Sequence, residues 1–213
     1  MRQDLERVLL SVVLAYLLGA IPFSLIVGKL TRGIDLREHG SGNLGAANTF
    51  RTLGPGPGLT VLLLDAGKGA ASVGAAALLW RESGGLGRID LMLLAGMTAV
   101  AGHIWSVFAS FRGGKGVATA AGVFAAVTPL AFAICVGVWL VTVALSRYIS
   151  LGSILAAICL PLAVHLTSSG ASAGGRLVFL VSLAVAVLVV ARHRGNISRL
   201  RHGNERKFSL RGG

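Results

Sequence analysis

Long runs of hydrophobic residues alternate with short polar segments along most of this chain. The runs lie at about residues 7–28, 57–80, 91–109, 117–128, 130–146, 149–166 and 177–191. Most of them approach the roughly 20 residues that a helix needs to cross a bilayer. The pattern therefore predicts an all-α integral membrane protein.

Two of these runs have boundaries that hydrophobicity alone does not set. The first has the basic start of a signal peptide, but it continues past Ala20 without a convincing small-residue cleavage site. We therefore expect a retained helix that reaches Gly28. In the stretch 117–146, Thr128 and Pro129 stand at the midpoint, and proline removes a helix hydrogen bond. That stretch is predicted to form two short helices.

Composition supports the membrane class. Hydrophobic residues make up 54% of the chain and charged residues 13%, with a mean hydropathy of +0.77. Ordinary soluble domains carry roughly 25% charged residues. The 213 residues leave room for five to seven spans and little else, so we expect one membrane domain over residues 1–213.

The net charge of +12 would suit a nucleic-acid partner, but the basic residues flank apolar runs. The lipid bilayer and anionic substrates account for that arrangement, so no nucleic acid is expected. Cys135 and Cys159 lie inside apolar runs without metal-ligand spacing, and no metal site is predicted.

Charge also predicts the orientation. Basic residues gather in the segments 29–51, 112–115 and 192–211, which the positive-inside rule places in the cytoplasm. The uncharged segment 167–175 suits the outside. The Lys115 loop and the tail share a side only if an even number of spans separates them. Splitting at Pro129 gives seven spans with the N-terminus outside and the C-terminus in the cytoplasm, and five spans are the alternative.

The first polar motif runs from Ser41 to Arg51. Serine and asparagine supply neutral hydrogen-bonding groups, and the Arg51 guanidinium can grip a phosphate or carboxylate with two N–H groups. A helix beginning at Ala46 would add N–H groups that favour an anion. The candidate binding residues are Ser41, Asn43, Gly45, Asn48 and Arg51. By itself, a segment of this composition also suits a plain turn.

The second motif is the glycine-rich segment Gly113–Gly116, which contains Lys115. Glycines let backbone N–H groups approach a phosphate, and the lysine adds a point charge. Because Gly116 follows Lys115, the segment lacks the spacing of a nucleotide-binding loop, and a small phosphate is the better ligand. The candidates are Gly113, Gly114, Lys115, Gly116 and Thr119, with His103 as a supporting residue. A plain cytoplasmic connector is the alternative.

Two further groups of polar residues complete the set. His193 and Asn196 share one face of a predicted helix and could address one ligand together, and Glu205 is expected to pair with a nearby arginine. A solvated basic tail is the alternative for this segment. Asp65 and Lys68 interrupt an apolar run at i, i+3 spacing, and buried charges in a span are costly unless paired. They are expected to form an ion pair.

Four patterns occur in order along the chain: Ser-Gly-Asn-x-Gly-Ala-x-Asn-x-x-Arg, Asp-x-x-Lys-Gly, Gly-His with Phe-x-Gly-Gly-Lys-Gly-Val-Ala-Thr, and His-x-x-Asn-Ile-x-Arg-Leu with Gly-x-Glu-x-Lys. Together they resemble the bacterial acyl-phosphate:glycerol-3-phosphate acyltransferase family (PlsY). The resemblance implies a seven-helix inner-membrane enzyme with its active site at the cytoplasmic face. It also implies transfer of an acyl group from acyl phosphate to the 1-hydroxyl of glycerol 3-phosphate, giving lysophosphatidic acid and phosphate, with no cofactor.

The resemblance also implies residue roles. By position, the family pattern makes Ser41, Asn43, Arg51, His193 and Asn196 active-site residues. It makes the Lys115 loop a phosphate-binding element and gives Glu205 a structural role. The chain departs from the pattern at Ala47, where threonine is common, and at Gly195, where glutamate is often found.

Mechanistically, soluble glycerol-phosphate acyltransferases use a His-x-x-x-x-Asp motif, and no histidine of this chain has that spacing. A histidine–aspartate base is therefore not expected. The hypothesis is direct attack by the glycerol 3-phosphate hydroxyl, with a substrate phosphate as proton acceptor and His193 as the second choice. A transporter of a small phosphate-bearing anion is the alternative function. The concentration of polar motifs on one predicted face, without a visible internal repeat, favours the enzyme.

Overall fold

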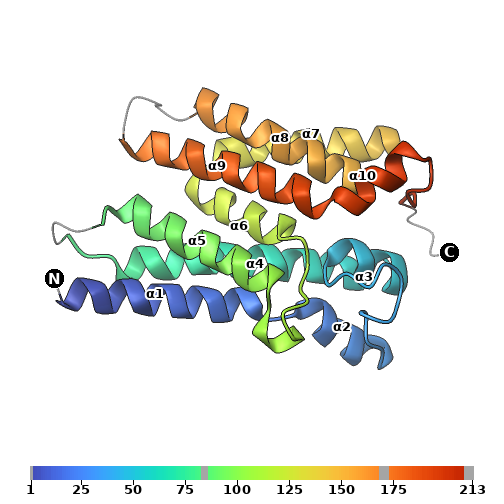
Figure 1. Ribbon diagram of the computed structural model, residues 1–213, viewed down its shortest axis with the longest axis horizontal. Helices are drawn as coiled ribbons and strands as arrows, with labels where there is room; N and C mark the ends of the chain where they lie inside the picture. The colour runs from blue at the N-terminus through green and yellow to red at the C-terminus, as the bar shows by residue number, and fades with distance from the viewer. Residues whose placement is uncertain (1, 83–85, 168–172, 209–213) are drawn as a thin grey trace. The chain divides into compact units, whose positions relative to one another are not determined.

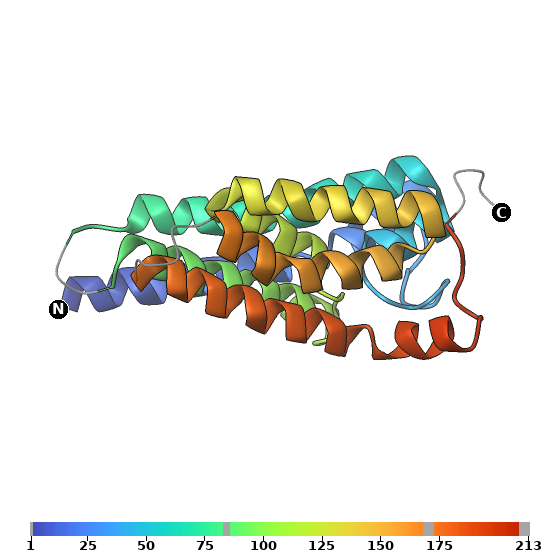
Figure 2. The same cartoon turned by 90° about the horizontal axis from the view of Figure 1, so that it is seen from above.

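The structure, a computed structural model, describes residues 2–82, 86–167 and 173–208. Every regular element in these ranges is helical, which confirms the predicted all-α class. The chain divides into two compact units, residues 1–127 and residues 128–213. Figures 1 and 2 show the helices of each unit from two directions.

The apolar runs of the sequence form the long helices of both units. The elements of the first unit are α1 (Arg2–Ala20), α2 (Phe23–Arg32), α3 (Ala46–Leu53), α4 (Pro55–Leu79), α5 (Arg88–Ile104), the 3-10 turn η1 (Val107–Ala109) and α6 (Val117–Val127). Those of the second unit are α7 (Pro129–Ser146), α8 (Ile149–Thr167), α9 (Ala173–Arg192) and α10 (Arg194–Arg201).

The first apolar run is broken, which corrects the prediction of one helix up to Gly28. Helix α1 ends at Ala20 and α2 begins at Phe23, with Ile21 and Pro22 between them. Proline has no N–H to donate and disfavours helical geometry in the residue before it, so the helix stops there although hydrophobicity continues. The break leaves the last carbonyl groups of α1 in need of other donors.

The division at Pro129 is confirmed. Helix α6 ends at Val127 and α7 begins at Pro129. Within the described ranges, six helical segments are long and apolar enough to cross a membrane, the first being the broken segment Gln3–Arg32. The 11-residue α6 is a further, shorter apolar helix beside these six. Its length of about 16 Å is near half of a bilayer's hydrocarbon thickness.

Orientation stays a prediction. Part of the expected outer segment, residues 168–172, and the last basic residue of the tail, Arg211, lie outside the described residues.

Glycines allow the helices of the first unit to approach closely. A Cβ atom on Gly19 would collide with the Ala99 carbonyl, and one on Gly69 would collide with the Thr119 carbonyl. These contacts join α1 to α5 and α4 to α6, which are among the most extensive helix pairs of the unit. Small residues let helix backbones pack closely where lipid supplies no hydrophobic driving force. Figure 1 shows α5 running opposite to α4 and α6 returning beside α4.

The second unit is a set of three long helices with a short one at the end. Helix α8 packs against both α7 and α9, as Figure 2 shows. After α10 the chain returns to the α7–α8 corner, where the Phe208 N–H donates to the Arg147 carbonyl at 2.6 Å. The end of the described chain is therefore attached to the start of α8.

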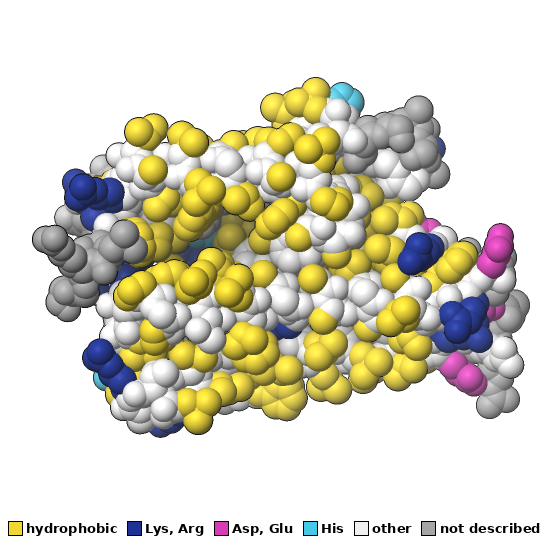
Figure 3. Space-filling model, turned by 180° about the vertical axis from the view of Figure 1, so that it is seen from behind, with side chains coloured by type: hydrophobic (Ala, Val, Ile, Leu, Met, Phe, Trp, Pro, Cys, Tyr) yellow, Lys and Arg dark blue, Asp and Glu magenta, His cyan; other side chains and the backbone are white. Residues whose placement is uncertain are grey.

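The outward faces of the helices are apolar, as lipid contact requires. Leu30, Leu78 and Leu145 are 81%, 77% and 83% exposed. Figure 3 shows hydrophobic side chains along the helices and charged side chains gathered near the helix ends. This distribution is typical of an integral membrane protein.

Candidate active site

The Ser41 motif forms a loop that Asn48 holds in shape. Asn48 is 1% exposed, and its amide nitrogen donates to the carbonyls of Leu36 at 3.1 Å and His39 at 3.0 Å. Its Oδ1 accepts the Ser41 N–H at 2.8 Å. The adjacent Gly40 and Gly42 have φ angles of 65° and 68°, a region that favours glycine. Asn48 thus uses its amide to fix the backbone that presents Ser41.

The other residues of this motif flank the exposed Ser41. A Cβ atom on Gly45 would lie 3.6 Å from the amide nitrogen of the half-buried Asn43, so these two candidates are neighbours. Helix α3 begins at Ala46, as expected, and carries the half-buried Arg51 in its last turn. The motif therefore presents a hydroxyl, an amide and a guanidinium from one loop and one helical turn.

A surface ion pair lies just before this loop. Arg37 Nη2 lies 2.6 Å from Asp35 Oδ2, and the Arg37 N–H also donates to Asp35. The side-chain hydrogen bond from Arg37 lowers the pKa of Asp35 to about 2. The Arg37 guanidinium therefore forms an ion pair with Asp35 of the same turn.

The glycine loop is attached to the end of α5. The Gly113 N–H donates to the Ile104 carbonyl at 3.0 Å, and the Gly114 N–H donates to the His103 carbonyl at 3.1 Å. A Cβ atom on Gly113 would collide with the His103 carbonyl. Close packing on α5 therefore accounts for glycine at 113, and these two N–H groups are bonded within the protein. Phosphate binding by Gly113 and Gly114 stays a prediction.

Gly114 joins the two candidate phosphate-binding motifs of this unit. A Cβ atom on Gly114 would collide both with the His103 ring and with the Leu44 carbonyl of the Ser41 loop. The backbone of the Lys115 loop therefore lies directly against the loop that carries Ser41. Lys115 itself is half buried, and the next residue, Gly116, has a φ of 83° at the start of α6.

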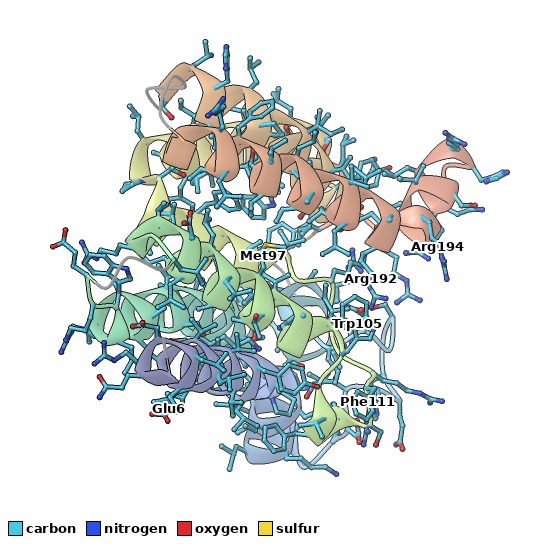
Figure 4. The ribbon with its side chains drawn as sticks, turned by 60° about the vertical axis from the view of Figure 1, so that its left-hand side comes forward. Glu6, Met97, Trp105, Phe111, Arg192 and Arg194 are labelled. Carbon is cyan, nitrogen blue, oxygen red and sulfur yellow. The ribbon has the colours of Figure 1, made fainter. Side chains whose placement is uncertain are left out.

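The segment that connects α5 to this loop exposes aromatic side chains. Trp105 and Phe111, both labelled in Figure 4, are 47% and 62% exposed. Tyr16 of α1 donates its hydroxyl to the Trp105 carbonyl at 2.7 Å. Aromatic side chains with this exposure suit the boundary between lipid and water.

A buried charged cluster lies beneath the loop. Lys68 Nζ lies 2.8 Å from Asp65 Oδ1, which confirms the predicted ion pair. His103 Nδ1 lies 3.4 Å from the same oxygen. The exposed fractions of Asp65, Lys68 and His103 are 2%, 5% and 7%. His103 therefore lies beside an aspartate that is distant in sequence, and the expectation that no histidine–aspartate base operates stays a prediction.

The cluster borders a small pocket within the first unit. Polar groups from Ser24, Asp65, Lys68, His103 and Ser106 line it together with Gly113, Gly114 and apolar residues of the α1–α2 break. Ser106 donates its hydroxyl to the Ala20 carbonyl, and Lys68 donates to the Ile21 carbonyl at 2.9 Å. Two carbonyls exposed by the break are thus satisfied by side chains from α4 and from the segment after α5.

Thr119 has a different setting from the other candidates. It is fully buried in the first turn of α6, where its carbonyl faces Gly69 of α4. Its hydroxyl has no hydrogen-bond partner among the described residues. Its predicted role in substrate binding stays a prediction.

In the second unit, Glu205 binds the predicted site residue Asn196. Glu205 Oε1 accepts hydrogen bonds from Asn196 Nδ2 at 2.6 Å and from the Ser150 hydroxyl at 2.7 Å. Its Oε2 accepts from Arg199 Nε at 2.7 Å, which confirms the expected arginine pair. Burial acts to raise the pKa of Glu205, but the hydrogen bonds from Ser150, Asn196 and Arg199 lower it below its ordinary value.

His193 stands at the bend between α9 and α10, between Arg192 and Arg194, which Figure 4 labels. It is 3% exposed, and Asn196 is 5% exposed. His193 Nδ1 lies 2.8 Å from the Val189 carbonyl. Because a carbonyl only accepts, Nδ1 carries the proton in the neutral ring and Nε2 holds the lone pair.

Gly195, where the family often has glutamate, lies on the exposed side of this bend. A Cβ atom there would lie 3.6 Å from an Arg199 guanidinium nitrogen. A side chain at this position would therefore extend beside Arg199, and glycine leaves that guanidinium with Glu205 as its described ion-pair partner.

Sequence reasoning missed Ser150 and Ser106. Both are buried, at 4% and 2% exposure, and each bonds to a partner distant in sequence. A lone serine at a helix end carries no pattern that would identify such a partner. Among the described residues, no three His, Cys, Asp or Glu side chains form a group suited to a metal ion.

Helices long and apolar enough to cross a membrane, with the Ser41 loop in contact with the Lys115 loop at one end of them, define the class of polytopic integral membrane proteins. The model of the glycerol-3-phosphate acyltransferase family matches residues 9–203, and the chain belongs to that family.

Curated relatives and solved structures agree with this family. The glycerol-3-phosphate acyltransferase of Desulforudis audaxviator is 46% identical over 96% of this chain and 97% of its own, and that of Chlorobaculum tepidum is 41% identical over 93% and 95%. The crystal structure of PlsY, an integral membrane glycerol 3-phosphate acyltransferase, in its glycerol 3-phosphate form has a TM-score of 0.84 at 39% identity. The superposition covers 95% of this chain and 96% of the PlsY chain. Its lysophosphatidic acid form has a TM-score of 0.81 at 38% identity.

Proposed function

We propose that this protein transfers an acyl group from an acyl phosphate to the 1-hydroxyl of glycerol 3-phosphate, releasing lysophosphatidic acid and phosphate. Acyl transfer to glycerol 3-phosphate is the activity of its family. The acyl phosphate donor, the bacterial inner membrane as location and the cytoplasmic face as the site of reaction are the further content of the proposal.

The contact at Gly114 is the observation that carries this proposal. It brings the loop of Lys115 against the loop of Ser41, whose motif continues to Arg51 in α3. Both proposed substrates bear phosphate, so a site with a lysine, an arginine and a hydroxyl on adjoining loops matches their charge. An acyl phosphate already has a good leaving group, and the protein then mainly has to neutralise anions and align the reacting groups.

The proposed step is a direct displacement. The 1-hydroxyl oxygen of glycerol 3-phosphate forms a bond to the acyl carbon, and the bond from that carbon to the phosphate oxygen breaks. The hydroxyl proton goes to a substrate phosphate, and inorganic phosphate leaves. Lys115 and Arg51 stabilise the phosphate charges, and Ser41 donates a hydrogen bond instead of becoming acylated.

His193 is the second choice as proton acceptor. The Val189 carbonyl fixes its neutral ring with the lone pair on Nε2, as a general base requires. Glu205 binds Asn196 through one carboxylate oxygen and Arg199 through the other. Its role in the proposal is to orient the Asn196 amide, and it takes no part in the acyl transfer.

Turnover with defined donors tests the proposal. Purified protein is incubated in lipid nanodiscs with labelled glycerol 3-phosphate and either palmitoyl phosphate or palmitoyl-CoA. We expect lysophosphatidic acid and an equal amount of inorganic phosphate with palmitoyl phosphate, and no product with palmitoyl-CoA. A Lys115→Ala variant controls for contaminating activity. Equal rates with both donors would contradict the proposed donor.

A further inference from the structure

The glycine loop lies deep along α4. His103 contacts both Asp65 and Gly114, so the loop stands near the level of Asp65, which follows Pro55 by ten residues. At a rise of 1.5 Å per residue, this is roughly 15 Å along the helix from its start. The shortness of α6, which begins directly after the loop, fits this recessed position. The loop therefore needs support from within the membrane-spanning helices.

His103 supports the loop in two ways. Its carbonyl accepts the Gly114 N–H at 3.1 Å, and its ring packs against Gly114 so closely that a Cβ atom there would collide with Nε2. The other ring nitrogen, Nδ1, faces the Asp65 carboxylate at 3.4 Å. The contact is electrostatic, since Asp65 Oδ1 accepts no hydrogen bond within the described residues, and the negative charge favours a ring orientation that keeps Nδ1 toward Asp65 and Nε2 against the loop.

Asp65 is held in turn by Lys68, and Lys68 is anchored at the α1–α2 break. Its Nζ lies 2.8 Å from Asp65, donates to the Ile21 carbonyl at 2.9 Å and lies 5.6 Å from the centroid of the Phe23 ring. Burying such a pair costs desolvation energy, and the close helix contacts at Gly69 and Gly19 are made without charges. Helix association alone therefore gives no reason to retain the charged cluster.

We propose that Asp65, Lys68 and His103 form a positioning network that holds the glycine loop in its substrate-binding conformation and so sets the affinity for glycerol 3-phosphate. The inference rests on the proposed function, because it assigns the Lys115 loop to that substrate. These three are positioning residues, since they act on the ligand through Gly114 and the loop backbone. The network links the break in the first span to the loop that binds the substrate.

Two substitutions separate the parts of the network. In His103→Asn the amide nitrogen takes the place of Nδ1 and still reaches toward Asp65, but the ring edge against Gly114 is lost. The Asp65–Lys68 pair stays intact, so this variant is expected to fold. In Asp65→Asn the ring remains, but the charge that orients it is removed. The matched control is Ser72→Ala, which deletes a hydroxyl that is 1% exposed on the same helix and bonds to the Lys68 carbonyl at 2.8 Å.

The steady-state constants decide between positioning and general destabilisation. Both variants are expected to raise KM for glycerol 3-phosphate by about tenfold, with kcat changed less than about threefold, because they act on the bound substrate through the position of the loop. Hydrogen exchange should become faster at the amides of residues 113–117. Ser72→Ala should lower the melting temperature without changing KM. The double variant should resemble either single variant, because both remove the same support.

A binding measurement keeps this test independent of the acyl donor. Glycerol 3-phosphate should raise the melting temperature of the wild-type protein in nanodiscs, and at the same concentration the rise should be smaller for His103→Asn and Asp65→Asn. If the wild type binds glycerol 3-phosphate but does not use acyl phosphate, the proposed donor fails while this prediction still stands. Wild-type affinity and unchanged loop exchange in His103→Asn would overturn the positioning network.

Discussion

Glu205 and Asn196 are joined by a hydrogen bond of 2.6 Å between Oε1 and Nδ2, and both side chains are buried. The same carboxylate binds Ser150 at the start of α8 and Arg199 in α10. One acid therefore ties the chain after α10 to two helices and fixes the amide of a predicted active-site residue. Asn196 is therefore oriented by a carboxylate that follows it in sequence.

This arrangement predicts a pH-dependent contribution of Glu205 to stability. Its pKa is lowered in the folded protein from an ordinary value of about 4.5, so the folded state favours the ionised form. The stabilisation is complete above that value and is lost as the pH falls through the lower, folded pKa. Glu205→Gln should therefore melt below the wild type at pH 7, and the difference should shrink as the pH falls below about 4.5. Thermal unfolding in detergent from pH 3.5 to 8 measures this, and a pH-independent difference would contradict it.

Arg51 and Lys115 are expected to hold phosphate by charge. Arg51→Ala and Lys115→Ala should each reduce kcat/KM by about 100-fold, as expected when a charged donor to the transition state is removed. Arg51→Lys should recover little, because a point charge does not replace two parallel N–H donors. Arg201→Ala, an exposed basic change in α10, is the matched control and should retain wild-type turnover. Full recovery by Arg51→Lys would contradict the two-donor role.

Asn48 should act through the shape of the Ser41 loop. Asn48→Ala removes three hydrogen bonds and leaves the carbonyls of Leu36 and His39 and the Ser41 N–H without this partner. A cost of about 1–3 kcal/mol is expected for the buried Leu36 carbonyl left unsatisfied, with a large loss of activity. Denaturant unfolding and hydrogen exchange at the Ser41 amide measure the effect. Thr60→Ala, which removes an exposed helix hydroxyl, is the control and should be nearly neutral.

The predicted topology can be tested by cysteine labelling. In a background with Cys135→Ala and Cys159→Ala, single cysteines are placed at the exposed positions Glu82, Arg112 and Ser198. In intact cells, Glu82→Cys should react with an impermeant maleimide, and the other two should react only with a permeant one. Labelling of Arg112→Cys and Ser198→Cys from opposite sides would contradict the seven-span orientation.

Hydropathy was enough to predict the helices, because a bilayer forces every backbone polar group of a span into internal hydrogen bonds. It did not reveal the break at Pro22, since Ile21 and Phe23 continue the apolar run. Local spacing predicted the Asp65–Lys68 pair because its members lie one helical turn apart. His103 joins them through the packing of α5 on α4, and no sequence interval encodes that contact.

The candidate site shows the same limit. From the sequence, the glycines at 113 and 114 predict backbone access for phosphate, whereas the structure also requires both glycines for packing on α5 and on the Ser41 loop. Asn48 shares a motif with the candidate ligand-binding residues, but its amide bonds to its own loop. Residue type indicated the chemistry, and only the tertiary contacts separated groups that face a ligand from groups that hold the loop.

Direct acyl transfer is the central claim, and intact-mass measurement after rapid mixing tests it most directly. Wild-type protein is mixed with labelled palmitoyl phosphate in the absence of glycerol 3-phosphate and quenched within milliseconds, with Ser41→Ala treated in parallel. Because Ser41 is expected to donate a hydrogen bond and not to attack, both proteins should keep their unmodified mass. A palmitoyl adduct on Ser41 that disappears when glycerol 3-phosphate is added would contradict direct transfer and establish a covalent acyl-enzyme intermediate.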